Sequence, residues 1–317
     1  MPFLTVNHLS SRYDSSKGLV YAVDDVSFEL EDGASIGIAG ESACGKSTLG
    51  LSIIRMLSGG KTSGEIVFDG DSILDVSESD FDEKYRWKKI SMVFQGAMNS
   101  LDPVFTIEEQ FHEILKEHNF DGDFKSIILD AMDSVRLDVS VLKKYPHELS
   151  GGMKQRVIIA MALLLKPKFV IADEPTTALD VLIQAQIINL LKNLKKEGMS
   201  FMLITHDLAV LSEIADYIGI MYGGQLVEFG TSDDIYKNPK HPYTKGLLES
   251  IPTLTGPAPK YIKGNPPSLL DAPTECRFIS RCPLAIEKCK QLPPKFKTNS
   301  GYVRCWLYDE ETELDLF

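Results

Sequence analysis

Residues 40–47, Gly-Glu-Ser-Ala-Cys-Gly-Lys-Ser, have the types and spacing that hold phosphate groups. An apolar run at 34–39 precedes them and apolar residues at helical spacing follow over 48–57, so the sequence predicts a buried strand, a glycine loop and a helix. The N–H groups of such a loop and the helix N-terminus favour an anion. Lys46 would neutralise phosphate oxygens and the Ser47 hydroxyl would bind Mg²⁺, which suits a nucleoside triphosphate. The alternative is a turn that merely contains glycine.

Two carboxylates, Asp173 and Glu174, directly follow a second apolar run at residues 169–172. That run predicts a buried parallel strand, and ligands of open α/β sheets bind at the carboxyl ends of such strands. One carboxylate there can hold Mg²⁺, and the next can orient and deprotonate an attacking water molecule. We assign Asp173 to the metal and Glu174 to the general base. The alternative is an acidic helix N-terminus ahead of Pro175.

A serine and two glycines, at residues 150–152, precede an apolar helix expected at residues 157–165. A serine cap and glycines at a helix start form another terminus suited to an anion. Taken alone this pattern is weak evidence, because Ser-Gly-Gly is common in turns. Its value comes from its position between the phosphate loop and the two carboxylates.

These three motifs, in this order, resemble the ATP-binding cassette (ABC) transporter family, whose signature corresponds to LSGGM at residues 149–153. Three further segments resemble the family's Q-loop, D-loop and switch histidine: residues 93–95, 177–180 and 203–207. The resemblance covers roughly residues 3–232. It implies an α/β fold, with a RecA-like P-loop NTPase core, an antiparallel β subdomain and a helical signature subdomain.

The resemblance also implies a role for each motif, with ATP held between the phosphate loop of one subunit and the signature of another. Nucleotide would be bound by Tyr13, Gly40, Glu41, Ser42, Ala43, Cys44, Gly45, Lys46, Ser47 and Thr48. The residues acting on the partner's nucleotide would be Ser150, Gly151, Gly152 and Asp180. The catalytic residues would be Glu174, His206 and Gln95. The Mg²⁺ ligands would be Ser47, Gln95 and Asp173.

Four residues around this site carry specific expectations. The resemblance places Tyr13 against adenine, with Tyr21 as the alternative stacking residue. It places His206 at the γ-phosphate, where the alternative is a hydrogen-bonded helix cap. If the φ angle of Ala43 is positive, alanine at this position lowers the stability of the fold by on the order of 1 kcal/mol relative to glycine. Cys44, beside the phosphates at a helix N-terminus, is expected to have a lowered thiol pKa.

A second distinctive segment follows the cassette at residues 238–252 and contains His241-Pro242-Tyr243. It resembles the oligopeptide/dipeptide importer subfamily, and details such as Met153 resemble the first (D-type) of its two ATPase subunits. The resemblance implies a second homologous ATPase subunit, two integral-membrane permeases and an extracellular solute-binding protein. We therefore expect the ATP-hydrolysing subunit of a peptide importer. The alternatives are the same role in nickel or oligosaccharide uptake, or a soluble ABC ATPase.

Four cysteines near the C-terminus have the spacing C-x5-C-x6-C-x15-C: Cys276, Cys282, Cys289 and Cys305. Clustered thiolates hold metals, and without close C-x2-C pairs an iron–sulfur cluster is more natural than zinc. Seven Lys or Arg residues within 276–306 would offset the charge of four thiolates. The family resemblance points to a [4Fe–4S] cluster, and zinc or free thiols are the alternatives.

Composition excludes several other classes of protein. The 33 Lys and Arg against 45 Asp and Glu give a net charge of -12, which disfavours nucleic acid as a partner. The longest apolar run, residues 157–165, is far shorter than the roughly 20 residues of a spanning helix. The first residues lack the pattern of a signal peptide. We expect a peripheral protein at the cytoplasmic face of the cell membrane.

The composition changes near residue 250, because nine of the 16 prolines lie between residues 252 and 294. We therefore expect three parts along the chain. An ABC nucleotide-binding domain would cover residues 1–232, and a helical segment with a linker would cover 233–258. A small cysteine-bearing extension would occupy residues 259–317.

Overall fold

The computed structural model describes residues 2–177, 179–252 and 259–309, and the chain forms two compact units. Unit 1 comprises Met1–Glu31, Ser35–Leu74 and Ile204–Phe317, and unit 2 comprises Asp32–Ala34 and Asp75–Leu203. The phosphate loop and the four late cysteines belong to unit 1. The signature and the two adjacent carboxylates belong to unit 2.

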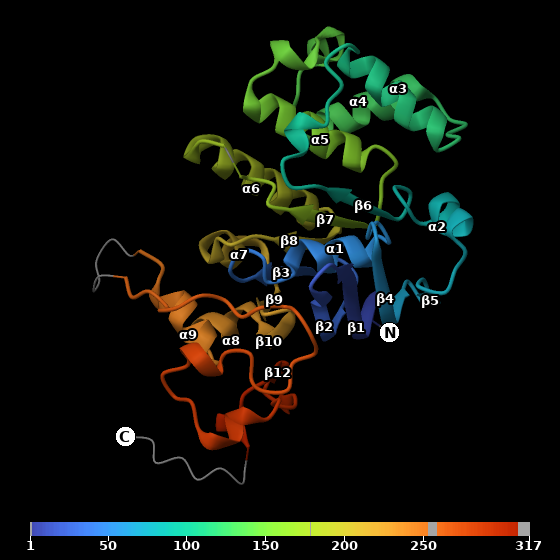
Figure 1. Ribbon diagram of the computed structural model, residues 1–317. Helices are drawn as coiled ribbons and strands as arrows, with labels where there is room; N and C mark the ends of the chain where they lie inside the picture. The colour runs from blue at the N-terminus through green and yellow to red at the C-terminus, as the bar shows by residue number, and fades with distance from the viewer. Residues whose placement is uncertain (1, 178, 253–258, 310–317) are drawn as a thin grey trace. The chain divides into compact units, whose positions relative to one another are not determined.

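Unit 1 contains a four-stranded antiparallel sheet in the order β2-β1-β4-β5 (Figure 1). Its strands are β1 (Leu4–Ser15), β2 (Gly18–Leu30), β4 (Gly60–Phe68) and β5 (Asp71–Ser72). Leu4 of β1 lies opposite both Leu30 of β2 and Phe68 of β4, and all three side chains are buried. Because alternate residues of a strand face opposite sides, this register gives the sheet one apolar face.

Five further strands of unit 1 are joined in the order β11-β12-β10-β9-β3. They are β3 (Ser35–Ala39), β9 (Tyr217–Tyr222), β10 (Gln225–Thr231), β11 (Phe296–Lys297) and β12 (Tyr302–Val303). β3 and β9 are parallel, whereas β9 with β10, β10 with β12 and β11 with β12 are antiparallel. All five residues of β3 are buried, which confirms the strand predicted from the apolar run. The C-terminal residues extend this group of strands beyond β10.

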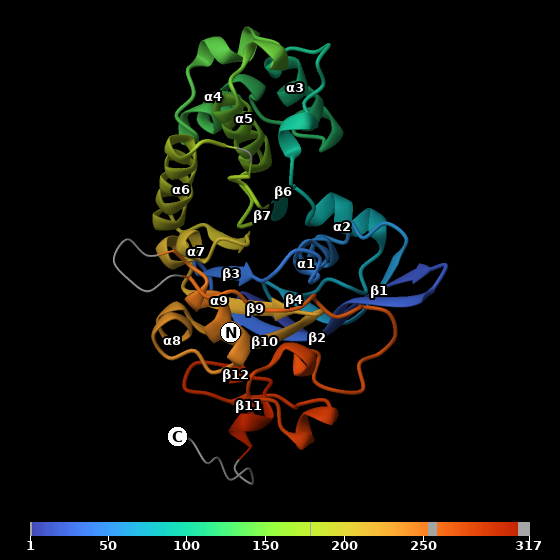
Figure 2. The ribbon, with the colours of Figure 1, turned by 60° about the vertical axis from the view of Figure 1, so that its left-hand side comes forward.

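The described part of unit 1 also contains α1 (Lys46–Ile53), α7 (Leu208–Ile214), α8 (Ser232–Lys237) and α9 (Pro242–Glu249). Helix α1 contacts β1 and β2, and α7 contacts β3 (Figure 2). A Cβ atom at Gly37 of β3 would lie 2.7 Å from the Leu211 side chain of α7, so glycine permits this close packing. Residues 259–309 are called the C-terminal region. Its short 3₁₀ helices are Ile279–Arg281, Glu287–Lys290 and Trp306–Tyr308.

Unit 2 has three strands in the order β8-β7-β6: β6 (Ile90–Val93), β7 (Phe169–Asp173) and β8 (Ser200–Ile204). Its α-helices are α2 (Glu78–Lys84), α3 (Ile107–Glu117), α4 (Phe124–Ser134), α5 (Gly151–Leu163) and α6 (Val181–Lys196). Its 3₁₀ helices are Ala97–Asn99, Val139–Lys143 and Pro146–Glu148. Helices α3 and α4 both contact α5, whose apolar residues are mostly buried. The helix expected at residues 157–165 is therefore present and begins earlier, at the two glycines.

The HPY segment (residues 241–243) forms the buried start of α9. The backbone N–H of Tyr243 donates a hydrogen bond to Nδ1 of His241 at 3.0 Å, and Pro242 is the first helical residue. The carboxylate of Glu228 in β10 accepts the backbone N–H of His241 at 2.9 Å and that of Lys240 at 2.6 Å. These bonds satisfy buried donors at the helix start and attach α9 to β10.

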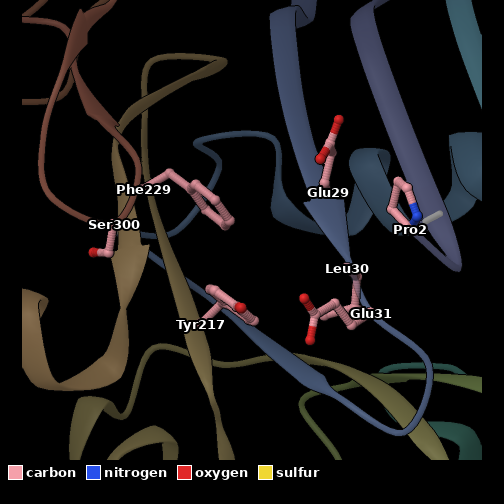
Figure 3. A pocket seen from close by; sticks show the side chains of 7 residues that line it. All are labelled: Pro2, Glu29, Leu30, Glu31, Tyr217, Phe229 and Ser300. Carbon is pink, nitrogen blue, oxygen red and sulfur yellow. The ribbon is translucent and has the colours of Figure 1, made fainter.

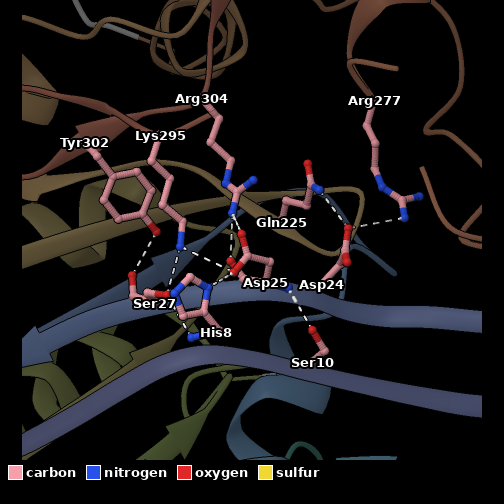
Figure 4. A network of polar contacts seen from close by, with 10 residues as sticks. All are labelled: His8, Ser10, Asp24, Asp25, Ser27, Gln225, Arg277, Lys295, Tyr302 and Arg304. Carbon is pink, nitrogen blue, oxygen red and sulfur yellow. Dashed lines mark hydrogen bonds and ion pairs between the residues drawn. The ribbon is translucent and has the colours of Figure 1, made fainter. Parts of the chain in front are cut away.

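Basic residues of the C-terminal region pair with two adjacent carboxylates of β2 (Figure 4). Arg304 forms an ion pair with Asp25, and Lys295 Nζ lies 3.6 Å from the same carboxylate. Arg277 lies 3.9 Å from Asp24. Burial raises the pKa of Asp25, but the hydrogen bonds and charges of Arg304, His8 and Lys295 together outweigh it, so that the pKa is lowered overall. The C-terminal region is thus attached to β2 by charge pairs.

We predict that His241→Asn makes the stability of the chain less dependent on pH. Complete burial lowers the pKa of His241 to about 3, against an ordinary value of 6.5. Between these values the unfolded chain binds a proton at this residue and the folded chain does not, so stability falls as the pH falls. As the pH falls from 6.5 to about 5, this residue lowers the free energy of unfolding by about 2 kcal/mol. Asparagine keeps a side-chain acceptor at the helix cap.

The measurement is urea unfolding of the wild type and of His241→Asn at about pH 7 and about pH 5. His147→Asn is the matched control, because His147 is exposed. If the two variants lose stability equally on acidification, His241 is not the group responsible.

Candidate nucleotide-binding site

The phosphate loop joins β3 to α1 and has a backbone that few residues can adopt. Its φ angles are positive at Gly40 (157°), Ala43 (60°) and Gly45 (105°). A Cβ atom at Gly45 would lie 2.0 Å from the carbonyl oxygen of Ala22, and one at Gly40 would lie 2.1 Å from that of Met221. Both positions therefore require glycine. Ala43 does have the positive φ for which the sequence predicts a cost.

Lys46 is buried at the start of α1, where its ammonium group turns back toward the loop. Its Nζ donates hydrogen bonds to the carbonyl oxygens of Gly40 and Glu41, both at 2.8 Å. Gly45 is the N-cap of α1 and adds no side-chain hydrogen bond there. The loop thus combines one positive charge with a helix N-terminus, which is the chemistry that a phosphate group needs.

Cys44 does not have the lowered pKa that its place in the sequence predicts. Its side chain is buried, and this burial raises the pKa of the thiol even though the nearby Lys46 ammonium acts in the opposite direction. The expectation of a lowered thiol pKa at this position is therefore wrong. Removal from water outweighs the favourable electrostatics of the helix N-terminus.

The two carboxylates of unit 2 lie at the end of β7. Asp173 is its last residue and is 3% exposed, and Glu174 follows with a φ of 46°. The Glu174 carboxylate accepts hydrogen bonds from the Thr177 hydroxyl at 2.7 Å and from Nε2 of Gln95 at 3.5 Å. Two of the predicted catalytic residues, Glu174 and Gln95, are thus brought together. The contact of Thr177 was not expected from the sequence.

The signature and the D-loop lie beside each other in unit 2. The Ser150 hydroxyl caps α5 by accepting the backbone N–H of the third helical residue at 3.4 Å. A Cβ atom at Gly152 would lie 2.8 Å from the Ile183 side chain of α6. Asp180 caps α6 by accepting the Ile183 N–H at 3.0 Å. Ala178, within the expected D-loop, lies outside the described residues.

His206 belongs to unit 1, comes after the end of β8 in the sequence, and is exposed. The helix cap considered for it is instead made by its neighbour, because Asp207 accepts the backbone N–H of Ala209 at 2.9 Å. The position of His206 at the γ-phosphate stays a prediction.

The two tyrosines considered for adenine stacking differ in their surroundings. Tyr13 lies within β1, where it pairs with Val20 of β2. The guanidinium of Arg12 lies 4.6 Å from the centre of the Tyr21 ring. One face of Tyr21 is therefore occupied by a cation, and Tyr13 stays the predicted stacking residue.

A pocket of about 570 Å³ in unit 1 is lined by none of these residues (Figure 3). Its lining consists of Pro2, Glu29, Leu30, Glu31, Tyr217, Phe229 and Ser300. The two carboxylates in this lining repel phosphate groups. The pocket is therefore not the nucleotide site.

The four late cysteines do not form the expected metal centre. Within residues 2–177, 179–252 and 259–309, no group of three or more His, Cys, Asp and Glu side chains could hold a metal ion. Burial raises the pKa of Cys276 to about 11 and that of Cys305 to about 12, and protonated thiols are poor ligands. The expectation of a [4Fe–4S] cluster, and of an iron–sulfur, metal-binding protein, is therefore wrong.

The basic residues expected to offset the charge of such a cluster have other partners. Six of the seven between residues 276 and 306 form ion pairs with carboxylates. The pairs are Arg277 with Asp24, Arg281 with Glu41, Lys288 with Asp309, Lys290 with Glu287, and both Lys295 and Arg304 with Asp25. Their excess positive charge is thus balanced without thiolates.

Comparisons with known proteins match both parts of the sequence pattern. A family model described as "ABC transporter" matches residues 23–177, and one described as "Oligopeptide/dipeptide transporter, C-terminal region" matches residues 227–289. The chain is 42% identical to the oligopeptide transport ATP-binding protein OppD of Haemophilus influenzae, with 99% of each chain covered. It is 44% identical to the oligopeptide transport ATP-binding protein AppD of Bacillus subtilis, with 97% of each covered. The chain belongs to the ABC transporter family.

Solved structures of ABC proteins support the same assignment. The cassette MJ0796, described as a dimer in a post-hydrolysis state bound to ADP and phosphate, matches with a TM-score of 0.64 and 28% identity. The match covers 72% of this chain and 98% of that one. The ABC ATPase fold is thereby confirmed. The relatives are named as transport ATP-binding proteins, without mention of iron or sulfur, which agrees with the correction above.

A helix that crosses a membrane needs about 20 consecutive, mostly apolar residues. Within the described parts of the chain, none of the helices combines the length and apolar character that crossing a bilayer requires.

We predict that Ala43→Gly stabilises the ABC cassette by about 1 kcal/mol, because glycine removes the strain of a positive φ. Urea unfolding measures the difference. The matched control is Ala209→Gly on the exposed face of α7. Its free energy of unfolding should fall by about 1 kcal/mol, because glycine destabilises a helix. Equal destabilisation by both variants would show that residue 43 carries no strain.

Proposed function

We propose that this ABC ATPase hydrolyses ATP and thereby drives uptake of oligopeptides or dipeptides through partner permeases. One observation carries the proposal: a single chain joins a phosphate loop of the required backbone to the buried HPY start of α9. The relatives' names support the substrate class, since they include a dipeptide transport ATP-binding protein of Caldanaerobacter subterraneus that is 42% identical. This chain covers 97% of that relative.

The proposed nucleotide site uses the residues predicted from the sequence. Residues 40–48 would bind the phosphates and Tyr13 would stack on adenine. The donors proposed for Mg²⁺, Ser47, Gln95 and Asp173, all offer oxygen, which this ion prefers. Bound Mg²⁺ supplies charge that neutralises phosphate oxygens. The burial of Asp173 at a strand end supports its place in this set.

Glu174 would act as the general base, taking a proton from the attacking water. Its carboxylate is already oriented by Thr177 and Gln95, which supports a fixed position for this proton transfer. His206 would contact the γ-phosphate, and Gln95 would contact the attacking water. Ser150, Gly151, Gly152 and Asp180 would act on the nucleotide of a second subunit. The places of Ser150, Gly151 and Gly152 at the N-terminus of α5 suit contact with an anion.

The proposed assembly contains a second homologous ATPase subunit, two integral-membrane permeases and an extracellular solute-binding protein. This chain would lie peripherally at the cytoplasmic face of the membrane. We propose residues 1–232 as its nucleotide-binding domain, 233–258 as the helical segment and linker, and 259–317 as a small C-terminal cysteine-bearing extension.

Purification of the tagged chain from gently solubilised native membranes tests this assembly. Two integral-membrane proteins, a second cassette and a solute-binding protein should be recovered and identified by mass spectrometry. The isolated solute-binding protein should then bind short peptides. Recovery of soluble partners alone would contradict the proposed importer.

We predict that Glu174→Gln lowers ATP turnover by about 100-fold or more, because it removes the base but keeps the size and hydrogen-bonding capacity of the side chain. ATP binding should persist, and the variant should accumulate as an ATP-bound dimer on gel filtration. Phosphate release measures turnover. The control is Glu197→Gln at the exposed end of α6, which should turn over at the wild-type rate. Normal turnover in Glu174→Gln would refute its role as base.

A further inference from the structure

Two side chains from distant parts of the sequence hold the phosphate loop at Glu41. The backbone N–H of Glu41 donates to the Tyr243 hydroxyl at 3.0 Å. Its carboxylate accepts hydrogen bonds from both terminal nitrogens of Arg281, each at 2.9 Å. The Arg281 side chain is only 4% exposed. A bidentate pair of this kind fixes orientation as well as distance.

Arg281 is itself held in place by other contacts. It donates hydrogen bonds to the hydroxyl of Tyr222 at 3.2 Å and to the carbonyl oxygens of Lys263 and Ile262 at 3.0 and 3.3 Å. The hydrogen bond to Glu41 has the largest effect in raising the pKa of Arg281, so the guanidinium stays charged. The position of Glu41 is therefore tied to β9 and to the chain around residue 262.

Tyr243 is likewise fixed, by an aromatic cluster under the loop. Its ring centre lies 4.5 Å from that of Tyr222 and 5.4 Å from that of Phe278. Tyr243 is fully buried, and Phe278 comes from the C-terminal region. Gly224 adds a backbone hydrogen bond to the carbonyl oxygen of Cys44 at 2.9 Å. The loop thus rests on α9, the β9–β10 turn and the C-terminal region together.

We propose that Arg281 of the C-terminal region and Tyr243 of α9 are positioning residues for ATP binding, which hold the phosphate loop at Glu41 in its binding conformation. This inference rests on the proposed role of the loop in binding ATP. The physical reason is entropic: a loop released at Glu41 samples more conformations, and the nucleotide must then order it on binding. Arg281 acts through Glu41 and needs no contact with ATP.

The first test measures ATP affinity and turnover of the full chain. Arg281→Met should raise the Kd for MgATP about tenfold, equivalent to one lost charged interaction, while kcat at saturating ATP changes less than about twofold. The matched control is Arg304→Met, because Arg304 is also 4% exposed and pairs with Asp25 of β2 instead of the loop. Its Kd for MgATP should stay at the wild-type value.

A double-mutant cycle tests whether the effect passes through Glu41. Glu41→Gln should also weaken ATP binding, and Glu41→Gln with Arg281→Met should be no weaker than either single variant. Arg281→Lys keeps the charge but not the bidentate geometry, so it should restore part of the affinity. Additive losses would overturn the proposal. Should Arg281→Met fail to fold, Arg281→Lys takes its place, and wild-type affinity in that variant would overturn the proposal.

The second test needs no nucleotide and therefore does not depend on the proposed ATPase function. Hydrogen exchange of the peptide covering residues 40–47 should be several-fold faster in Arg281→Met than in the wild type, and unchanged in Arg304→Met. Wild-type exchange and affinity in Arg281→Met, despite a lower melting temperature, would show a merely structural role and refute the inference. A wild type that binds no MgATP would refute the ATPase function. The exchange comparison would still decide whether Arg281 holds the phosphate loop at Glu41.

Discussion

The backbone of the phosphate loop is the constraint around which unit 1 is arranged. Three positive φ angles occur within residues 40–45, and two of them bring glycines against the carbonyl oxygens of Ala22 and Met221. The loop can therefore approach β2 and β9 only because these glycines lack side chains. These contacts orient the N-terminus of α1, which follows the loop. The anion site therefore depends on the packing of the loop against β2 and β9.

Charge pairs attach the C-terminal region to this arrangement. Arg277 and Arg304 pair with carboxylates of β2, and Arg281 pairs with the phosphate loop itself. Buried charges need partners of opposite sign, and each pair is satisfied only when both chain segments take their native places. The basic residues that the sequence suggested for a thiolate cluster are used for this attachment instead.

In unit 2 the backbone is strained at Glu174, the proposed general base. Glu174 has a positive φ, and its carboxylate is held by Thr177 and by Gln95, which follows β6. Strain at a residue of this kind persists only where surrounding contacts determine the conformation. The hydrogen bonds to Glu174 provide such contacts and orient the carboxylate before any substrate is present.

The sequence by itself determined the features that depend on neighbouring residues. It predicted β3, the phosphate loop, α1 and the strand ending at Asp173, because apolar periodicity and glycine spacing act over a few residues. It missed the contact between Glu41 and Arg281, which are 240 residues apart. It was wrong about Cys44 and the late cysteines, because the ionisation of a thiol depends on burial and nearby charges. Only the tertiary structure decides these, since folding alone brings distant segments together and removes their groups from water.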